Sequence, residues 1–372
     1  MKSNCFAIFL VFLFLFKGLC LNAQDTDSIS QNSDNLSQIL NQHFEGQWFL
    51  AYQYKDLKDE EISQFTLKRS YLTLKHTFNE RYSVRFTQDI TLDEEGSDAG
   101  NVEMRLKYCY LNMKLDNFMI FHKPSVEIGL VHRPWLDFEQ SINPYRIQGK
   151  MFLERVGLLN SADFGFTFMG LLGGEMDDKY QEHVNTDFPG KYGSISLGVY
   201  NGSGYHDLEN NKNKTFESRI TLRPFHAALP GLQFSYFMLY GKGNIESEPD
   251  FTIHNLFVSY ENKYFTLTNQ WYTGKGNSAG TFIGPDLNAY DNEGFSLFGE
   301  YKFPKYRWTA FARYDFFETE QTEAIDNQRI IAGIGYYFYK KSKFVLDLEY
   351  MDSGMDHSWR HYFYEAAIEI NF

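Results

Sequence analysis

Hydrophobic and polar residues alternate with a period of two over most of the chain, from residue 47 to residue 372. The segment 359–372 shows the pattern most clearly, because Tyr364 and Ile368 fall on one face and Glu365 falls between them on the other. This alternation predicts β-strands whose two faces meet different surroundings. Charges stand in the middle of these strands, so we expect water along the whole polar face and lipid along the apolar, aromatic face.

The same alternation recurs in sixteen segments, most of them longer than the ~5–6 residues of a globular strand. A strand that crosses a membrane needs ~9–11 residues. The pattern therefore predicts an all-β, antiparallel transmembrane β-barrel of about 16 strands, with 18 as the alternative. The expected strands are 47–54, 62–77, 81–92, 101–115, 124–133, 161–172, 191–201, 215–224, 231–242, 252–260, 263–273, 293–303, 306–317, 327–340, 343–351 and 359–372.

The connections between these segments alternate between short turns and longer loops, which is typical of outer-membrane barrels. The connection 134–160 is the third long loop and the best helix candidate. The segment 173–190 is long although it lies on the short-turn side, so it is either a periplasmic insertion or a sign of a different strand count. A slip in the alternation near Arg69 and Ser70 predicts a β-bulge.

The first residues form a separate segment. Residues 1–23 combine Lys2, an apolar run and Ala23 before the expected cleavage point, which predicts a secretory signal peptide. Residues 24–46 are polar and are expected to form a periplasmic N-terminal segment, before the barrel at 47–372. Cys109 is then the one cysteine of the mature chain, and the alternation places it on the luminal face.

Composition narrows the possible functions. Aromatic residues make up 18% of the chain and the net charge is −13, which excludes a disordered chain and disfavours nucleic-acid binding. Gly202-Ser203-Gly204 lacks the nucleophile elbow of a serine hydrolase, and we expect no cofactor and no metal. The tetrapeptide Gly-Lys-Gly-Asn occurs at 241–244 and again at 274–277, where each copy is expected to be the point at which a strand leaves the barrel.

One region resembles a known family. Residues 128–135 read Ile-Gly-Leu-Val-His-Arg-Pro-Trp, the dipeptide Glu154-Arg155 follows, and 197–202 read Leu-Gly-Val-Tyr-Asn-Gly. This sequence resembles the Bacteroidota branch of the phosphate-selective porin O/P-like family. The resemblance implies a sixteen-stranded porin, commonly a homotrimer, whose third loop folds into the lumen. Phe372 also resembles the C-terminal aromatic residue that the barrel-assembly machinery recognises in outer-membrane proteins.

The third loop would then carry the constriction of the pore. Its cations Arg133, Arg146, Lys150 and Arg155 are the expected anion-contacting residues, because a charged side chain replaces part of an ion's hydration. The alternative for each is an ion pair with a nearby acid that fixes the loop to the wall. Arg155 is the strongest candidate for such a structural role.

The wall of the lumen adds further cations. Taking the charged face of each strand as luminal gives twelve cations and ten anions, so the wall alone does not decide selectivity. Cations facing acids across the lumen would instead set up a transverse field. The wall cations expected in the first half of the barrel are Arg81, Arg85, Arg105, Lys107, Arg219 and Arg223.

These expectations predict a porin in the outer membrane of a Gram-negative bacterium, which admits small hydrophilic solutes by passive diffusion and has some preference for anions or phosphate. The expected partners are outer-membrane lipid, lipopolysaccharide, the barrel-assembly machinery and small anions. Two alternatives are a plugged structural or adhesin barrel and an outer-membrane barrel enzyme.

Overall fold

A computed structural model of the chain describes residues 43–57, 60–93, 100–320, 328–353 and 359–372. Phe44–Phe372 form one compact unit. The predicted signal peptide and residues 24–42 lie outside the described residues. None of the helices in the described ranges is long and apolar enough to cross a membrane.

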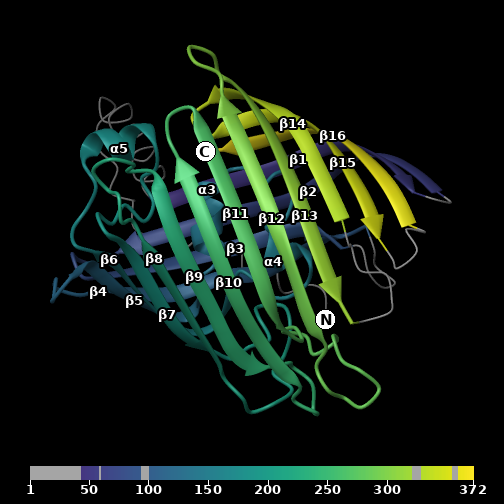
Figure 1. The fold of residues 1–372 in the computed structure, drawn as a ribbon, viewed down its shortest axis with the longest axis horizontal. Coiled ribbons are helices and arrows are strands. Elements are labelled where there is room, and N and C mark those ends of the chain that lie inside the picture. The colour runs from purple at the N-terminus through teal and green to yellow at the C-terminus, as the bar shows by residue number, and fades with distance from the viewer. Residues whose placement is uncertain (1–42, 58–59, 94–99, 321–327, 354–358) are drawn as a thin grey trace, which may run out of the picture. The chain divides into compact units, whose positions relative to one another are not determined.

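The unit is a closed antiparallel barrel of sixteen strands, as predicted (Figure 1). Each strand pairs with its neighbours in sequence, and β1 pairs with β16 to close the ring. The first strand begins at Phe44, three residues earlier than expected. The strands are β1 Phe44–Leu57, β2 Glu60–Thr77, β3 Tyr82–Leu92, β4 Val102–Lys114, β5 Phe121–His132, β6 Ala162–Leu172, β7 Gly193–Tyr200, β8 Thr215–Leu222, β9 Leu232–Lys242, β10 Asp250–Glu261, β11 Phe265–Lys275, β12 Asp291–Lys302, β13 Trp308–Thr319, β14 Gln328–Tyr339, β15 Ser342–Ser353 and β16 Trp359–Asn371.

Alternation along each strand separates an outward face from a luminal face. In β10 and β11, Leu256 and Trp271 point outward and are 56% and 47% exposed, whereas Asn255 and Gln270 point inward and are buried. Large apolar side chains are exposed in the same way around the ring. A continuous apolar belt of this kind is the surface that a barrel presents to lipid.

The register shifts at four of the strand pairings, β1–β2, β3–β4, β5–β6 and β14–β15, and the first two of these shifts bear on the predicted faces. One lies where β1 pairs with β2, between Phe49 and Leu50, and confirms the slip expected near Arg69. The second lies where β3 pairs with β4, between Thr87 and Gln88, and Lys107 is the extra residue of β4. The extra residue turns the following side chains to the opposite face, so Cys109 is exposed on the outer surface. The prediction of a luminal Cys109 was wrong for this reason.

The connections define two ends of the barrel, here called the loop end, where β5 ends and β6 begins, and the turn end, where β16 ends. At the loop end, the connection between β5 and β6 holds two short helices, α3 Leu136–Ile142 and α4 Phe152–Arg155. At the turn end, the connection between β6 and β7 holds α5 Asp178–His183. The strand count is therefore as expected, and 173–192 is an insertion between neighbouring strands.

Candidate functional site: the luminal constriction

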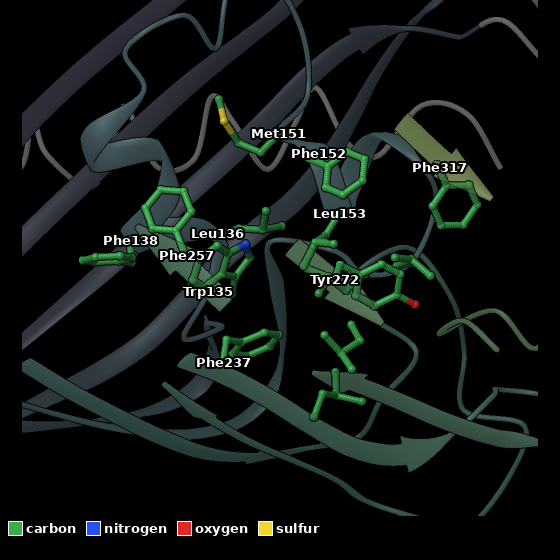
Figure 2. Close-up of a cluster of buried hydrophobic side chains, with 14 of the residues drawn as sticks. Trp135, Leu136, Phe138, Met151, Phe152, Leu153, Phe237, Phe257, Tyr272 and Phe317 are labelled. Carbon is green, nitrogen blue, oxygen red and sulfur yellow. The ribbon is translucent and has the colours of Figure 1, made fainter. Parts of the chain in front are cut away.

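The third loop, residues 133–161, folds into the lumen, as the resemblance implied. Trp135 at its start packs its ring 5.6 Å from Phe237 and 5.2 Å from Phe257, which point inward from β9 and β10. Around these rings a cluster of buried apolar side chains joins the loop to the wall (Figure 2). Burial of apolar surface therefore fixes both limbs of the loop, residues 135–142 and 151–159, against the wall of the barrel. The loop contributes Trp135, Leu136, Phe138, Ile142, Met151, Phe152, Leu153, Leu158 and Leu159, and the wall contributes Phe237, Leu239, Phe251, Ile253, Phe257, Tyr272 and Phe317.

Tyr145 attaches the middle of the loop to the wall at β12 and β13. Its ring stacks on Phe311 of β13, with 3.8 Å between the ring centroids. Its hydroxyl donates a hydrogen bond to Glu300 Oε1 (2.9 Å) and shares another with Thr309 Oγ1 (2.6 Å). Lys343 donates to the Pro144 carbonyl at 2.7 Å. The loop is therefore held to the wall at several strands between β9 and β15.

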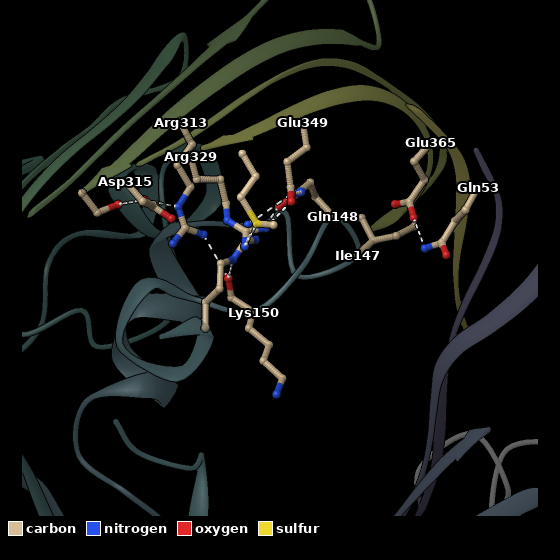
Figure 3. Close-up of polar contacts among 12 residues, drawn as sticks. Gln53, Ile147, Gln148, Lys150, Arg313, Asp315, Arg329, Glu349 and Glu365 are labelled. Atoms are coloured by element: carbon tan, nitrogen blue, oxygen red, sulfur yellow. Dashed lines mark hydrogen bonds and ion pairs between the residues drawn. The ribbon is translucent and has the colours of Figure 1, made fainter. Parts of the chain in front are cut away.

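A polar network fixes the next segment of the loop (Figure 3). Arg155 donates to Gln148 Oε1 (2.8 Å) and lies 3.3 Å from Glu349 of β15, and Gln148 also donates to Glu349 (2.8 Å). The Lys150 carbonyl accepts hydrogen bonds from Arg155 Nε (3.1 Å) and Arg313 Nη1 (3.0 Å). These contacts anchor the backbone at Lys150 and leave its side chain free to project.

The Lys150 ammonium is the exposed cation of this constriction. Residue 150 is exposed, and its side chain has no ion-pair partner among the described residues. Figure 3 shows the side chain extending away from the network that holds its backbone. The pKa of nearby Arg155 is lowered to about 10 by burial and by Arg313, so Arg155 stays charged at neutral pH and is neutralised by Glu349.

The insertion at the turn end also enters the lumen, which the sequence did not indicate. Asn185 donates to the Ser141 carbonyl of the third loop (3.0 Å) and to Glu261 of β10 (3.0 Å). Phe188 packs 5.5 Å from Phe138 of α3. The insertion and the third loop approach from opposite ends of the barrel and meet against β8–β10.

The four predicted constriction residues separate into different roles. Lys150 is exposed, and Arg146 is mostly buried and pairs with Glu154 at 3.2 Å. Arg155 is held by Glu349 and Gln148. Arg133 is completely buried and pairs with Glu217 of β8. A side chain with no exposed surface cannot contact a permeating ion, so the prediction for Arg133 was wrong.

Three of the predicted wall cations are not on an accessible wall. Arg219 and Arg223 are buried, Arg219 lying 4.2 Å from the ring of Phe138 and Arg223 lying 4.6 Å from the ring of Tyr180. Arg81 lies in the turn before β3 and pairs with Asp116 across the rim (2.7 Å). These predictions failed because the covering segments and the exact strand ends depend on the fold.

The remaining predicted wall cations point into the lumen from β3 and β4. Arg85 contacts His132 Nε2 (3.1 Å), and Arg105 pairs with Glu103 and contacts His206 Nδ1 (3.0 Å). Lys107 points inward but is buried, with its ammonium 3.0 Å from the Tyr71 hydroxyl. Arg85 and Arg105 therefore retain partial access to the lumen.

The sequence analysis did not predict two cations that point into the lumen, Lys68 and Arg69. Lys68 donates to the carbonyls of Ile147 and Gln148 and pairs with Glu365, and Arg69 lies 3.3 Å from Asp89. Consecutive strand residues normally point to opposite faces, but the bulge in β2 turns both of these inward. The slip in the alternation near Arg69 and Ser70 was the sequence feature from which their inward direction could have been predicted. Among the described residues, no group of three or more His, Cys, Asp or Glu side chains could hold a metal ion.

Comparisons with known proteins agree on the fold. No family profile and no curated protein sequence matches the chain, so the resemblance to the phosphate-selective family is not shown. Among solved structures, an anion-selective porin from Comamonas acidovorans matches with 8% identity and a TM-score of 0.58, covering 88% of this chain and 98% of the porin. The outer-membrane channel DcaP of Acinetobacter baumannii matches with 12% identity and a TM-score of 0.55, over 88% and 97%. A loop-deletion mutant of OmpT, an outer membrane protein of Vibrio cholerae, matches with 14% identity and a TM-score of 0.57, over 88% and 98%. The chain thus has the fold of a sixteen-stranded outer-membrane barrel.

Proposed function

We propose that this protein is an outer-membrane porin through which small hydrophilic solutes diffuse passively, with a preference for anions. The observation that carries the proposal is the exposed Lys150 ammonium, which has no ion-pair partner in the described part of the chain and belongs to a loop that Tyr145 and Arg313 hold inside the barrel. The apolar outer belt and the likeness in fold to porins and channels support the location and the channel role.

The mechanism involves positioning and electrostatics and no covalent step. Tyr145, Arg155 and Arg313 hold the loop backbone, so the remaining opening sets the size limit. Lys150 is the exposed cation that this loop would offer to a passing solute, whereas Arg146 of the same loop is paired with Glu154. A fixed ammonium offsets part of the cost of removing water from an anion and raises the barrier for a cation.

The test is ion selectivity in a planar bilayer with a salt gradient. Replacing Lys150 by Glu changes the local charge by two units, which at about 8 Å in water alters the energy of a monovalent ion by about 1 kcal/mol. Because the anion is disfavoured and the cation favoured by that amount, the two differ by about 2 kcal/mol, and we expect the anion-to-cation permeability ratio to fall about thirtyfold. Lys263→Glu, on the exposed turn between β10 and β11, makes the same charge change outside the lumen and serves as the control. Equal reversal potentials for the Lys150 variant and the wild type would contradict the anion preference.

A plugged barrel is the second candidate, because a specific observation favours it. The cluster around Trp135 and the insertion at Phe188 fill the lumen along β8–β10. Swelling of liposomes in sugars of increasing size separates the two functions. A porin admits the smaller sugars, whereas a plugged barrel admits none of them.

We further propose that the loop end faces the outside of the cell, that the barrel forms a homotrimer, and that Phe372 acts in recognition by the assembly machinery. The trimer is supported by the likeness in fold to OmpT of Vibrio cholerae in its trimer form, with 14% identity and a TM-score of 0.52. Semi-native gel migration before and after heating tests the trimer. Accessibility of a tag inserted at the loop end in intact cells tests the orientation.

A further inference from the structure

Half of the rim at the turn end is built from connections that contain no acidic residue. Four successive connections at this end, which join β8 to β9, β10 to β11, β12 to β13 and β14 to β15, lack both Asp and Glu. Their residues are 223–231, 262–264, 303–307 and 340–341. The other half of the same rim differs, since it carries Asp116 between β4 and β5 and Asp178 in the insertion.

The same connections carry several exposed cations. These are Lys263, Lys305, Arg307, Lys340 and Lys341. None of the five forms an ion pair in the described part of the chain. The guanidinium of Arg307 donates a hydrogen bond to the Phe338 carbonyl (2.7 Å), which fixes its position and leaves its charge uncompensated.

The acids nearest to these cations do not share their surface. Glu261 and Glu300 are buried and point into the lumen. Asp187 of the insertion lies within electrostatic reach of Lys341, so we leave Lys341 out of the surface considered below. The remaining four cations are together called the basic rim, and they are Lys263, Lys305, Arg307 and Lys340.

Tyrosine rings lie among the cations of the basic rim. The Lys263 ammonium is 4.8 Å from the centre of the Tyr264 ring, and the Lys340 ammonium is 5.3 Å from that of Tyr339. Tyr306, between Lys305 and Arg307, is 73% exposed. Tyrosine is enriched where a membrane meets water, because its ring is apolar and its hydroxyl is polar. The rings therefore indicate that the basic rim lies at the level of lipid head groups.

The length of β13 agrees with this level. Between Arg307 and Glu318 the outward residues of β13 are apolar, and they are Trp308, Ala310, Ala312, Tyr314 and Phe316. Arg307 and Glu318 are eleven residues apart, or about 36 Å at ~3.3 Å per residue. For a strand tilted by ~40°, this is about 28 Å along the membrane normal, close to the ~25 Å height of the apolar band of such barrels. Arg307 and Glu318 therefore stand at opposite surfaces of the membrane.

We propose that the basic rim binds anionic phospholipid whose head group carries no amine, of the phosphatidylglycerol type. The ammonium and guanidinium groups contact the lipid phosphate, and the acyl chains lie on the apolar face of β11–β14. An amine-bearing head group brings a cation of its own, for which these four connections offer no carboxylate. The proposal requires that the outer face meets lipid, and it goes beyond the proposed channel because conduction plays no part in it.

Native mass spectrometry of the refolded protein in a neutral detergent tests the site. With dioleoyl phosphatidylglycerol or dioleoyl phosphatidylethanolamine added separately, we expect the wild type to retain several-fold more phosphatidylglycerol. The triple variant Lys263→Gln, Lys305→Gln, Lys340→Gln should retain the two lipids about equally. Arg307 is left in place because it also holds the Phe338 carbonyl.

The matched control removes three exposed lysines at the loop end. The variant Lys212→Gln, Lys214→Gln, Lys275→Gln has the same net charge as the first variant and should keep the wild-type preference. Equal retention of the two lipids by the wild type would overturn the proposal. An equal loss of preference in both variants would also overturn it, since binding would then follow net charge and not the basic rim.

Ionic strength gives a second measurement that needs only the wild type. Because exposed charges are screened by salt, raising the ionic strength about fivefold should weaken retention of phosphatidylglycerol and leave that of phosphatidylethanolamine nearly unchanged. This measurement keeps the test decisive if a variant does not fold, which heat-dependent gel migration shows. Retention of phosphatidylglycerol that does not respond to salt would mean that the cations do not bind its phosphate.

Discussion

The ring of Phe372 lies directly over Gly46, where the first and last strands close the barrel. The backbones of the two residues exchange hydrogen bonds of 2.8 and 3.0 Å, and a Cβ atom at Gly46 would fall 2.1 Å from the ring. The same ring packs edge-to-face on Trp48, with 5.2 Å between centroids. A side chain at position 46 therefore cannot coexist with this ring position.

We predict that Gly46→Val destabilises the barrel by about 1–3 kcal/mol, the usual cost of overpacking. The measurement is urea unfolding of protein refolded into lipid vesicles without assembly factors, which separates packing at the seam from recognition of Phe372. Combining Gly46→Val with Phe372→Ala should relieve the clash, so the penalty of the valine should be smaller in that background. An equal penalty in both backgrounds would show that the ring is not the obstacle.

We predict that Tyr145→Phe loosens the third loop while the barrel remains intact. The substitution keeps the stack on Phe311 and removes the hydroxyl that serves Glu300 and Thr309. Leaving a buried partner unsatisfied costs about 1–3 kcal/mol. Single-channel recordings should show more current fluctuation than the wild type. Tyr364→Phe, on the outer face of β16, is the matched control and should leave the recordings unchanged.

We predict that Phe188→Ala increases conductance. The phenylalanine brings the insertion against Phe138 and lies 4.9 Å from the Arg219 guanidinium, so truncation weakens the packing that fills this side of the lumen. The comparison is single-channel conductance against Phe225→Ala, which removes the same ring from an exposed turn. A conductance equal to that of the control would mean that the insertion does not limit flow.

We predict that acid releases the loop between β7 and β8. Burial, Arg105 and Arg69 lower the pKa of His206 from 6.5 to about 4, although Asp89 acts in the opposite direction. Because the pKa in the folded protein lies below the ordinary value, the loop contact contributes fully above pH 6.5 and is lost as the pH falls from 6.5 through 4. The protection factors of residues 201–214, which are hydrogen-exchange rates corrected for the intrinsic effect of pH, measure the release when compared at pH 7 and pH 4.

His206→Gln is the control for that experiment, since glutamine can still accept a hydrogen bond from Arg105 and does not titrate. The protection factors of residues 201–214 in this variant should change less between pH 7 and pH 4 than those of the wild type. If the protection factors of residues 201–214 in the wild type are the same at pH 7 and pH 4, His206 does not hold the loop.

The strands could be predicted from the sequence because the environment of each face repeats every second residue. Water on one side and lipid on the other impose the same rule on β10, β13 and β16, so local alternation is sufficient information. The rule failed at Lys107, where one extra residue reversed the faces and carried Cys109 to the outside. A bulge reverses the direction of the side chains that follow it but leaves the types of residue in the strand unchanged. The alternation of residue types therefore did not reveal the bulge in β4.

The candidate site could be predicted only in part. The resemblance correctly implied that the third loop enters the lumen, whereas the role of Lys150 in contacting anions stays a prediction. The sequence could not show that Arg133 is covered and paired with Glu217, a residue 84 positions away. It also missed Lys68 and Arg69 and the entry of the insertion at Asn185. Such contacts are decided by which segments cover the wall, and this depends on the closed barrel.

The hydrogen bond from Asn185 to Ser141 has an evolutionary consequence. It joins two segments that enter from opposite sides of the membrane, so a change in the length of one removes the support of the other. Deletions near residue 185 and rearrangements near residue 141 should therefore be inherited together. Homologues with a short connection between β6 and β7 should carry a third loop that follows a different path.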